Sequence, residues 1–430
     1  MCPPPCARMM KRDSEAEDRT IQYAPVEDAE SIERYQPGGY HPVHIGDHLG
    51  PNCRYLVVHK LGFGGHSTVW LGRDQINHQY VAIKIGTSDD AIDPRERRAL
   101  ELIQNSPATH DVAKDHLPAI LSTFTQSGPN GIHQCLATTP GMCSLSSSKS
   151  ASDGVWLFNM DVARAMTAQL IRTVTFLHSR DLIHGDLHPG NILLKSQDLN
   201  SLSIEDIYAK YGSPTRESVV RLDGAPLSSH VPSYVVLPVW LGKPCEDITL
   251  QNANVMIADF GEAWETRSCS RFILNTPCIF RPPEAMFTEA EGKPIGSAAD
   301  IWTLGCTIYS IFAQRDLFEG FSPDEDDVFA ENVSTLGKPP EAWWETWRAR
   351  KQFFNDNGEW DVKAPRICDG DYRSLATRVN YIQEDRRGGV VDEEMADLYD
   401  MLESMIRWQP EERISAAQLV GGKWMSKWGS

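Results

Sequence analysis

The stretch HGDLHPGNILL, residues 184–194, decides how this sequence is interpreted. Asp186 is followed by Asn191, and an apolar run closes the segment. A carboxylate in such a loop can orient an attacking hydroxyl and accept its proton, while the amide can hold a metal ion that bridges phosphates. The spacing therefore points to phosphoryl-transfer chemistry, with Asp186 as the catalytic carboxylate and Asn191 as a metal ligand.

A second candidate metal ligand lies in the stretch IADFGEA, residues 257–263, after a short apolar strand. The carboxylate of Asp259 suits Mg²⁺, a hard cation that prefers oxygen ligands. An isolated Asp-Phe-Gly is common, but one that follows an HGDLHPGN stretch in this order is not. Asp259 and Asn191 are therefore predicted to share one metal site.

The stretch LGFGGHSTVW, residues 61–70, lies between two strand-like patterns. Gly62 and Gly64 would let the backbone approach phosphates at points where a side chain would clash. Alone this pattern is weak, because glycine-rich hairpin turns are common. The candidate nucleotide-binding residues of this loop are Leu61, Gly62, Phe63, Gly64, Gly65, His66, Ser67, Thr68 and Val69.

The next predicted strand, VAIKIG at residues 81–86, supplies Lys84 as a fixed ammonium group for the α- and β-phosphates. A glutamate from the following helix should hold this ammonium group, and both Glu96 and Glu101 fall in that helix. Glu96 shares the apolar face of the helix, which favours it as the partner. The alternative role for Glu96 is a capping box with Asp93.

The composition is that of an acidic protein, with 59 acidic residues, 41 basic residues and a formal charge of −18. Direct nucleic-acid binding is not expected, because phosphate contacts need Lys and Arg. The ten cysteines lack the spacing of a disulfide framework or a zinc site, which favours reduced thiols. Neither a membrane span nor a signal peptide is visible. We therefore expect a soluble monomer in the cytoplasm, the nucleus or both, without a membrane partner.

The pattern along the chain predicts an α+β fold with two lobes. Residues 1–53 form an N-terminal extension, which is expected to be disordered up to about residue 35 because this part is polar and charged. Residues 54–141 form a small β-rich lobe, and residues 142–428 form a larger helical lobe. The stretch TTPGMCSLSSSKSASDG between them is a linker by composition. An insert at residues 195–254 exceeds ordinary loop length and should be functional or partly structured.

Three further motifs follow in order: TPCIFRPPEAMF, SAADIWTLGC and QPEERISAAQL. With the glycine-rich loop, the lysine, HGDLHPGN and Asp-Phe-Gly, this set resembles the eukaryotic protein kinase family over residues 55–425. The resemblance implies the bilobal protein-kinase fold, with the insert placed between the catalytic loop and Asp-Phe-Gly. Within that family, GGYHPVHIGD and LGFGGHSTVWLGRD look like the SR-protein kinases of the CMGC group, and pieces of the insert look like the fungal members.

The resemblance to SR-protein kinases implies a Ser/Thr protein kinase that uses ATP and Mg²⁺. Its protein substrates would be basic and rich in Arg and Ser, often proteins of mRNA splicing. Ala82 would line the ATP pocket, and Thr138 would be the gatekeeper beside the adenine. The catalytic and metal-binding roles of the family would fall on Lys84, Glu96, Asp186, Asn191 and Asp259.

Three residues depart from the pattern of the family. Gly185 replaces an Arg that would bind a phosphorylated activation segment, so we expect activity that does not depend on such phosphorylation. His188 replaces a Lys near the γ-phosphate and is a weaker, pH-dependent cation. Pro277 replaces a Thr of the substrate-facing loop, with Thr276 one place earlier.

These departures keep a second hypothesis open, in which the chain is a weakly active pseudokinase or an ATP-binding scaffold; the intact lysine, catalytic carboxylate and metal ligands argue against it. A third hypothesis is a small-molecule kinase, because HGDLHPGN is similar to the loop of aminoglycoside and choline phosphotransferases. The Pro-Pro-Glu and Asp-x-Trp motifs argue against that one. Residues 320–347 are acidic and could dock a basic substrate, or they could form a solvated loop with an aromatic packing helix.

Overall fold

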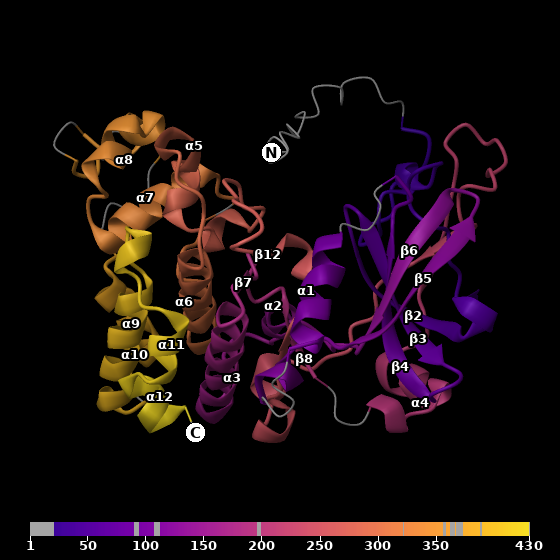
Figure 1. The fold of residues 1–430 in the computed structure, drawn as a ribbon, viewed down its shortest axis with the longest axis horizontal. Coiled ribbons are helices and arrows are strands. Elements are labelled where there is room, and N and C mark those ends of the chain that lie inside the picture. Colours follow the sequence, from indigo (N-terminus) through magenta and orange to yellow (C-terminus); the bar gives the residue numbers. More distant parts are fainter. Residues whose placement is uncertain are drawn as a thin grey trace.

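The computed structural model describes residues 21–89, 94–106, 112–195, 199–320, 322–355, 358–361, 366, 373–387 and 389–429. Figure 1 shows two lobes side by side, one built on a β-sheet and the other on helices, with α1 between them. Across the described ranges, no helix is both long and apolar enough to cross a membrane.

The small lobe is built on a six-stranded antiparallel sheet with the order β1-β2-β3-β4-β6-β5. Alternate side chains of these strands bury an apolar cluster that includes Val57, Trp70 and Ile83. The register places Lys84 of β4 opposite Val69 of β3 and Leu136 of β6. The strands are β1 (His48–Leu49), β2 (Tyr55–Gly64), β3 (Ser67–Asp74), β4 (Gln79–Gly86), β5 (Ile120–Gly128) and β6 (Gly131–Thr138).

Two helices, α3 and α6, form the centre of the helical lobe because apolar residues recur along them at helical spacing. Every residue of α6 after Ala298 is buried. The stretch predicted to be a linker instead contains α2, whose first turn is capped by Ser144. The helices of the molecule are α1 (Pro94–Gln104), α2 (Leu145–Ser150), α3 (Met160–His178), α4 (Ile204–Tyr211), α5 (Thr288–Glu291), α6 (Ala298–Phe312), α7 (Glu325–Leu336), α8 (Glu341–Thr346), α9 (Leu375–Asp385), α10 (Asp392–Met405), α11 (Ala416–Val420) and α12 (Lys423–Trp428).

Two short strand pairs hold the loops that carry the chemistry. β7 (Leu182–Ile183) pairs with β12 (Trp264–Glu265), and β8 (Ile192–Leu194) pairs with β11 (Val255–Ile257). The HGDLHPGN residues therefore connect β7 to β8, and the Asp-Phe-Gly residues connect β11 to β12. Since each connection leaves one strand pair and enters the other, the pairing fixes the two loops beside each other.

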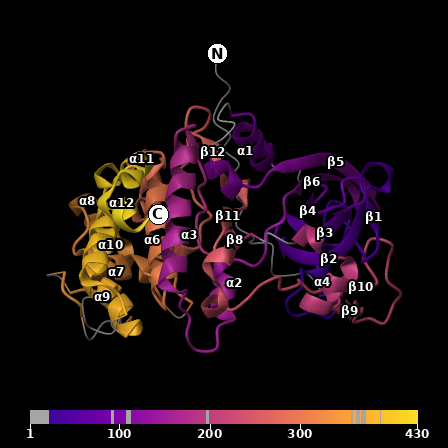
Figure 2. The same cartoon turned by 90° about the horizontal axis from the view of Figure 1, so that it is seen from below.

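The insert and the N-terminal extension pack together against the sheet lobe, and Figure 2 shows α4, β9 and β10 beside the sheet. Residues 1–20 of the extension, expected to be disordered, lie outside the described residues. Residues 21–35 are folded, because Ile32 and Tyr35 are buried against valines of the insert. The polar composition of residues 21–35 predicted disorder, because composition does not reveal the apolar residues of the insert that cover this segment. The strands of the insert are β9 (Arg216–Ser218) and β10 (Tyr234–Val236).

Candidate active site

The carboxylate of Asp300, in the first turn of α6, fixes the start of the HGDLHPGN loop. It accepts hydrogen bonds from the backbone N–H of His184 at 2.8 Å and of Gly185 at 2.9 Å, and His178 Nε2 lies 2.9 Å away. Burial alone would raise the pKa of Asp300, but His178 and the backbone donors outweigh burial and lower it. Asp300 therefore stays charged and holds the loop backbone in place.

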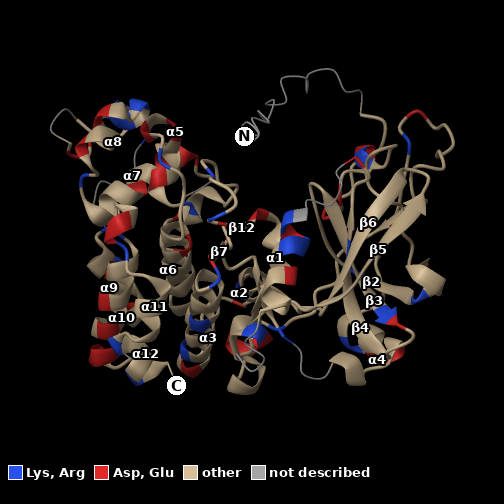
Figure 3. Cartoon of the chain, viewed as in Figure 1, with Lys and Arg blue, Asp and Glu red and all other residues tan. Residues whose placement is uncertain are grey.

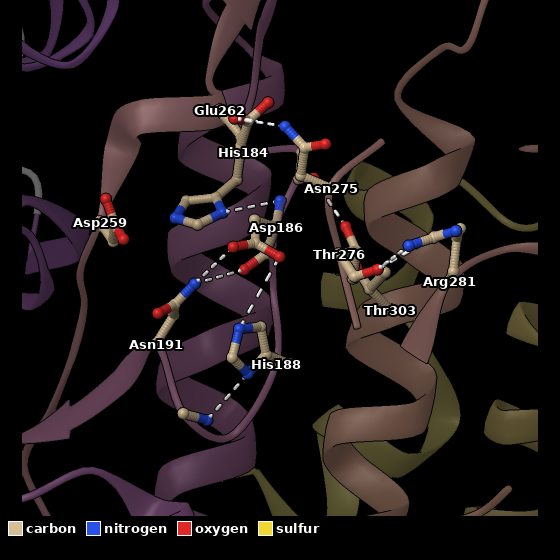
Figure 4. A network of polar contacts seen from close by, with 12 residues as sticks. His184, Asp186, His188, Asn191, Asp259, Glu262, Asn275, Thr276, Arg281 and Thr303 are labelled. Carbon is tan, nitrogen blue, oxygen red and sulfur yellow. Dashed lines mark hydrogen bonds and ion pairs between the residues drawn. The ribbon is translucent and has the colours of Figure 1, made fainter. Parts of the chain in front are cut away.

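The two carboxylate oxygens of Asp186 differ in their hydrogen bonds. Its Oδ2 accepts a hydrogen bond from Asn191 Nδ2 at 2.9 Å, as Figure 4 shows. Its Oδ1 is buried and has no hydrogen-bond partner within the described chain. A buried acceptor without a partner is costly, so such an atom usually has a role when a ligand is present. The geometry suits an oxygen that accepts a hydrogen bond from a substrate hydroxyl.

His188 stands beside this free oxygen, with its Nε2 3.7 Å from Asp186 Oδ1. That distance is too long for a hydrogen bond. The Nδ1 of His188 accepts the backbone N–H of Gly190 at 3.1 Å, so in the neutral ring the proton sits on Nε2, on the side of Asp186 (Figure 4). His188 can therefore donate a hydrogen bond in its neutral form, whereas the sequence alone had suggested a role for a partly protonated ring.

Lys84 lies between two carboxylates. Its Nζ is 2.7 Å from Glu96 Oε2 and 3.1 Å from Asp259 Oδ1. Glu101 instead points outward and lies 3.4 Å from Arg97, so the choice between the two glutamates falls on Glu96. The alternative partner Asp93 lies outside the described residues. Burial alone would lower the pKa of Lys84, but the Glu96 and Asp259 carboxylates raise it well above its ordinary value, so the ammonium group keeps its charge.

The predicted metal ligands Asn191 and Asp259 come together. The backbone carbonyl of Asn191 accepts the N–H of Ala258 at 2.8 Å, which places Asp259 directly beside it. Asp186 engages the amide nitrogen of Asn191 and leaves the amide oxygen for a cation. One carboxylate and one amide oxygen, with further oxygens from phosphates and water, fit a divalent ion such as Mg²⁺.

A cleft of about 560 Å³ runs between the lobes beside these residues. Of the predicted nucleotide-binding residues, seven line it: Leu61, Gly62, Phe63, Val69, Ala82, Lys84 and Thr138. A Cβ added to Gly62 or Gly64 would meet no atom within 4 Å, so there is open space where phosphates would approach the loop. The cleft therefore has the size and the open backbone that a nucleotide needs.

Five residues of the glycine-rich loop do not line the cleft with their side chains: Gly64, Gly65, His66, Ser67 and Thr68. The case is clearest for Thr68, which is buried and accepts a hydrogen bond from Trp70 Nε1 at 3.0 Å. Thr68 faces away because side chains alternate along β3, so its neighbour Val69 faces the cleft. The sequence located the turn of the glycine-rich loop, but it did not show which of its residues face the cleft and which face away from it.

Several lining residues were absent from the sequence predictions. Leu136, Leu193 and Met256 line the cleft, and so does the insert segment Pro238–Leu241. Leu193 and Met256 could have been found, because they are the middle residues of β8 and β11, the short strands next to Asn191 and Asp259. Nothing in the sequence of the insert indicated that it reaches the cleft.

The family description "Protein kinase domain" matches residues 55–208 and 245–425 of this chain. The chain belongs to the protein kinase family. The unmatched residues 209–244 fall within residues 195–254, the predicted insert. The bilobal α+β fold is confirmed as well: the crystal structure of the kinase domain of PF14_0431 superposes with a TM-score of 0.60 and 17% identity, over 90% of this chain and 98% of that one.

Two relatives place the chain within a smaller group of the protein kinase family. Protein kinase dsk1 of Schizosaccharomyces pombe is 33% identical, over 92% of this chain and 85% of that protein. The serine/threonine-protein kinase SRPK of Physarum polycephalum is 27% identical, over 77% of each chain. The predicted membership in the SR-protein kinase family is confirmed, so this chain is a Ser/Thr protein kinase. A protein kinase domain acts on protein substrates and uses ATP with a divalent metal ion.

The activation segment of the kinase, residues 259–284, is held by a carboxylate rather than by a cation. Glu262 accepts hydrogen bonds from Arg271 Nη1 at 2.6 Å and from Asn275 Nδ2 at 2.9 Å. A second ion pair, 2.7 Å between Arg98 of α1 and Glu265, ties the segment to the helix that carries Glu96. These contacts join parts of the segment to one another and to α1.

The C-terminal part of the activation segment packs on the catalytic loop through Thr276. Its Oγ1 donates to the carbonyl of Gly185 at 2.9 Å, while its own carbonyl accepts from Arg281 Nε at 3.0 Å (Figure 4). Thr276 thus joins the catalytic loop to the segment although Pro277 occupies the position where the family pattern has Thr. The hydrogen bond to the catalytic loop is therefore made although the Thr lies one residue earlier than in the family pattern.

Proposed function

We propose that this kinase transfers the γ-phosphate of Mg-ATP to Ser, or Thr, hydroxyls of Arg/Ser-rich proteins linked to mRNA splicing. The catalytic part rests on the carboxylate of Asp186, whose buried Oδ1 has no hydrogen-bond partner among the residues that the structure describes, while Oδ2 is held by Asn191. The substrate class is supported by the SRPK relative and by the formal charge of −18, which favours basic partners.

Each residue of the site has a distinct task in this proposal. Asp186 Oδ1 accepts the hydrogen bond of the substrate hydroxyl, orients its oxygen toward the γ-phosphorus and takes the proton. Lys84, kept charged by Glu96, binds the α- and β-phosphates. His188 donates through Nε2 to a phosphate oxygen beside Asp186. Asn191 and Asp259 would hold Mg²⁺, which neutralises charge on the phosphates when it is bound.

We further propose that activity does not require phosphorylation of the activation segment. A phosphate there would have to find a cation near the catalytic loop, where Gly185 provides none. The Glu262 contacts with Arg271 and Asn275 already order the segment. The kinase should therefore be active as synthesised, and treatment with a phosphatase should leave its rate unchanged.

The acidic stretch at 320–347 gives less support to substrate docking than its charge suggests. Acidic and basic residues are interleaved around α7 and α8 in Figure 3. Arg366 pairs with Asp324 and Asp327, and Arg378 pairs with the buried Glu331. An incoming Arg-rich peptide would have to displace these arginines. Phe329, Trp343, Trp344 and Trp347 of the stretch belong to a buried cluster, which agrees with the packing alternative.

The test is phosphate transfer from Mg-ATP to an Arg-Ser repeat peptide, with Asp186→Asn as the blank. A Lys-Ser repeat peptide of equal charge serves as the control for substrate class, and amino-alcohol acceptors test the small-molecule alternative. Transfer to the Arg-Ser peptide that is lost in Asp186→Asn supports the proposal. Transfer to both peptides at equal rates would refute Arg selectivity, and nucleotide binding without any transfer would indicate a pseudokinase.

The setting of the kinase in the cell is also a proposal. We propose a monomer that works in the cytoplasm, the nucleus or both, without direct contact with nucleic acid or membrane. The excess of acidic residues supports the absence of nucleic-acid contact, because a phosphate backbone would be repelled. Light scattering of the purified chain and imaging of a tagged copy would test the two parts separately.

A further inference from the structure

The insert segment Pro238–Leu241 is fixed across the junction of the two lobes. The backbone N–H of Val239 donates to the carbonyl of Lys60 in β2 at 2.8 Å, next to the start of the glycine-rich loop. The carbonyl of Leu241 accepts the N–H of Cys143, in the connection between the lobes, at 2.9 Å. The segment therefore touches both lobes at the edge of the cleft, and all four of its residues line the cleft.

Burial alternates along this segment. Val239 and Leu241 pack into an apolar cluster beneath the sheet that also contains Val58 and Leu71. Trp240 lies between them in the sequence and is left outside this cluster. Its ring is 42% exposed although it lines the cleft, so a large aromatic face is left uncovered there.

Trp240 is also held in place by its neighbours. A Cβ on Gly242 would lie 2.9 Å from Trp240 Cε2 and 2.4 Å from Cys143 Sγ, so the indole packs against the chain where no side chain would fit. The ring therefore stands next to the connection between the lobes. Lys84 and Asp259 mark the phosphate end of the cleft, and neither is part of this packing. An indole beside the connection is placed to meet the base and the ribose.

We propose that Trp240 is a nucleotide-contacting residue of this kinase, whose indole packs on the adenosine half of ATP and determines part of its affinity. The inference rests on the proposed kinase function, because it assigns the ligand of the same cleft. An aromatic face can pack on a purine or a ribose, and such contacts add favourable free energy beyond the buried area. Phe63, at 40% exposure, lines the same cleft from the glycine-rich loop and offers a second such face.

The experiment compares the dissociation constants of Mg-ADP and of adenosine, measured by calorimetry for wild type, Trp240→Ala, Trp240→Phe and Trp156→Ala. Trp156 is the matched control, because it is 44% exposed but does not line the cleft. Trp240→Ala should weaken both ligands by about two- to tenfold, and Trp240→Phe should keep most of the affinity. Trp156→Ala should bind both ligands as wild type does. Adenosine carries no phosphate, so its loss of affinity locates the contact on the nucleoside.

Equal dissociation constants for wild type and a folded Trp240→Ala protein would overturn the inference. An effect on Mg-ADP without one on adenosine would also overturn it, because the contact would then lie at the phosphates. If Trp240→Ala does not fold, Trp240→Leu keeps an apolar side chain without an aromatic face and answers the same question. A wild type that binds neither ligand would instead refute the proposed kinase function.

Discussion

Gly185 and Trp264 are packed so closely that a Cβ on Gly185 would lie 2.4 Å from Cζ3 of the Trp264 ring. The φ angle of Gly185 is also +77°, a backbone conformation that other residues adopt only with strain. The catalytic loop therefore requires glycine for two independent reasons. Trp264 fills the space in which the family pattern would have an arginine, so this chain could not recover that arginine by one substitution.

Gly185→Ala should lower the free energy of unfolding by about 2–4 kcal/mol, because the backbone strain at positive φ adds to the steric overlap with Trp264. Gly154→Ala is the matched control: Gly154 has a φ of +85°, but a Cβ there would meet no atom within 4 Å. The control should cost only about 1–2 kcal/mol from backbone strain. Urea unfolding of both variants measures the difference, and equal losses would show that the Trp264 contact is unimportant.

Glu96→Gln should reduce phosphate transfer by about tenfold or more, because Lys84 loses the charge that positions it. Glu101→Gln lies on the same helix and removes only an exposed contact with Arg97, so its rate should match wild type. Steady-state kinetics at varied ATP concentration measures both. Loss of activity in the Glu101 variant but not in the Glu96 variant would reverse the assignment.

Glu262→Gln should reduce activity several-fold without any change in phosphorylation state. The carboxylate accepts two hydrogen bonds from the activation segment, and charge-assisted bonds are worth about 1.5–3 kcal/mol each. Limited proteolysis should cut residues 266–275 faster in the variant, because the segment is less well held. A wild-type enzyme that loses activity on phosphatase treatment would contradict the role given to Glu262.

Tyr40→Phe should raise the KM for ATP by about two- to tenfold, which corresponds to the free energy of one hydrogen bond. The hydroxyl of Tyr40, in the N-terminal extension, donates to the carbonyl of Gly64 at 2.7 Å and so fixes the tip of the glycine-rich loop. Tyr399→Phe removes a comparable 2.9 Å bond to Glu403 on α10 and should leave the KM unchanged. An unchanged KM in Tyr40→Phe would mean that the loop is held by other contacts.

Asp74→Asn should lower the free energy of unfolding by about 2 kcal/mol at neutral pH. The hydrogen bonds from Arg54 hold the pKa of Asp74 at about 2, below its ordinary 3.8. A lowered pKa stabilises the fold above the unfolded-state value, and this stabilisation is lost as the pH falls through the folded-state value. The difference between wild type and Asp74→Asn should therefore shrink to about half at pH 3. A difference that stays constant from pH 7 to pH 3 would exclude this linkage.

The sequence predicted the parts of the site that depend on short-range order. Lys84 lies within β4, and Asp186, Asn191 and Asp259 lie in the tight loops that join short strands, so their spacing and flanking residues were sufficient. Helix periodicity favoured Glu96 over Glu101, because only one face of a helix meets the sheet. The distance of 2.7 Å between Lys84 Nζ and Glu96 Oε2 identifies Glu96 as the partner.

Long-range packing could not be predicted in the same way. The side-chain directions within the glycine-rich loop, the folding of residues 21–35 and the arrival of Trp240 at the cleft all depend on partners far along the chain. Composition predicted disorder at residues 21–35, where the structure has buried side chains. It predicted a linker at residues 138–154, where the structure has α2. The apolar groups that are buried in those segments are covered by residues from other elements, and local patterns carry no record of such pairings.

The sequence was enough to establish the family and the fold, because the motifs follow one another in the order of the protein kinase family over residues 55–425, and it predicted which groups take part in phosphoryl transfer. How the departures from the family pattern are accommodated depends on the folded chain. Trp264 occupies the space that an arginine would need, Glu262 orders the activation segment, and the insert completes the edge of the cleft. These are contacts between distant segments, and their energies depend on distances that only the folded chain sets.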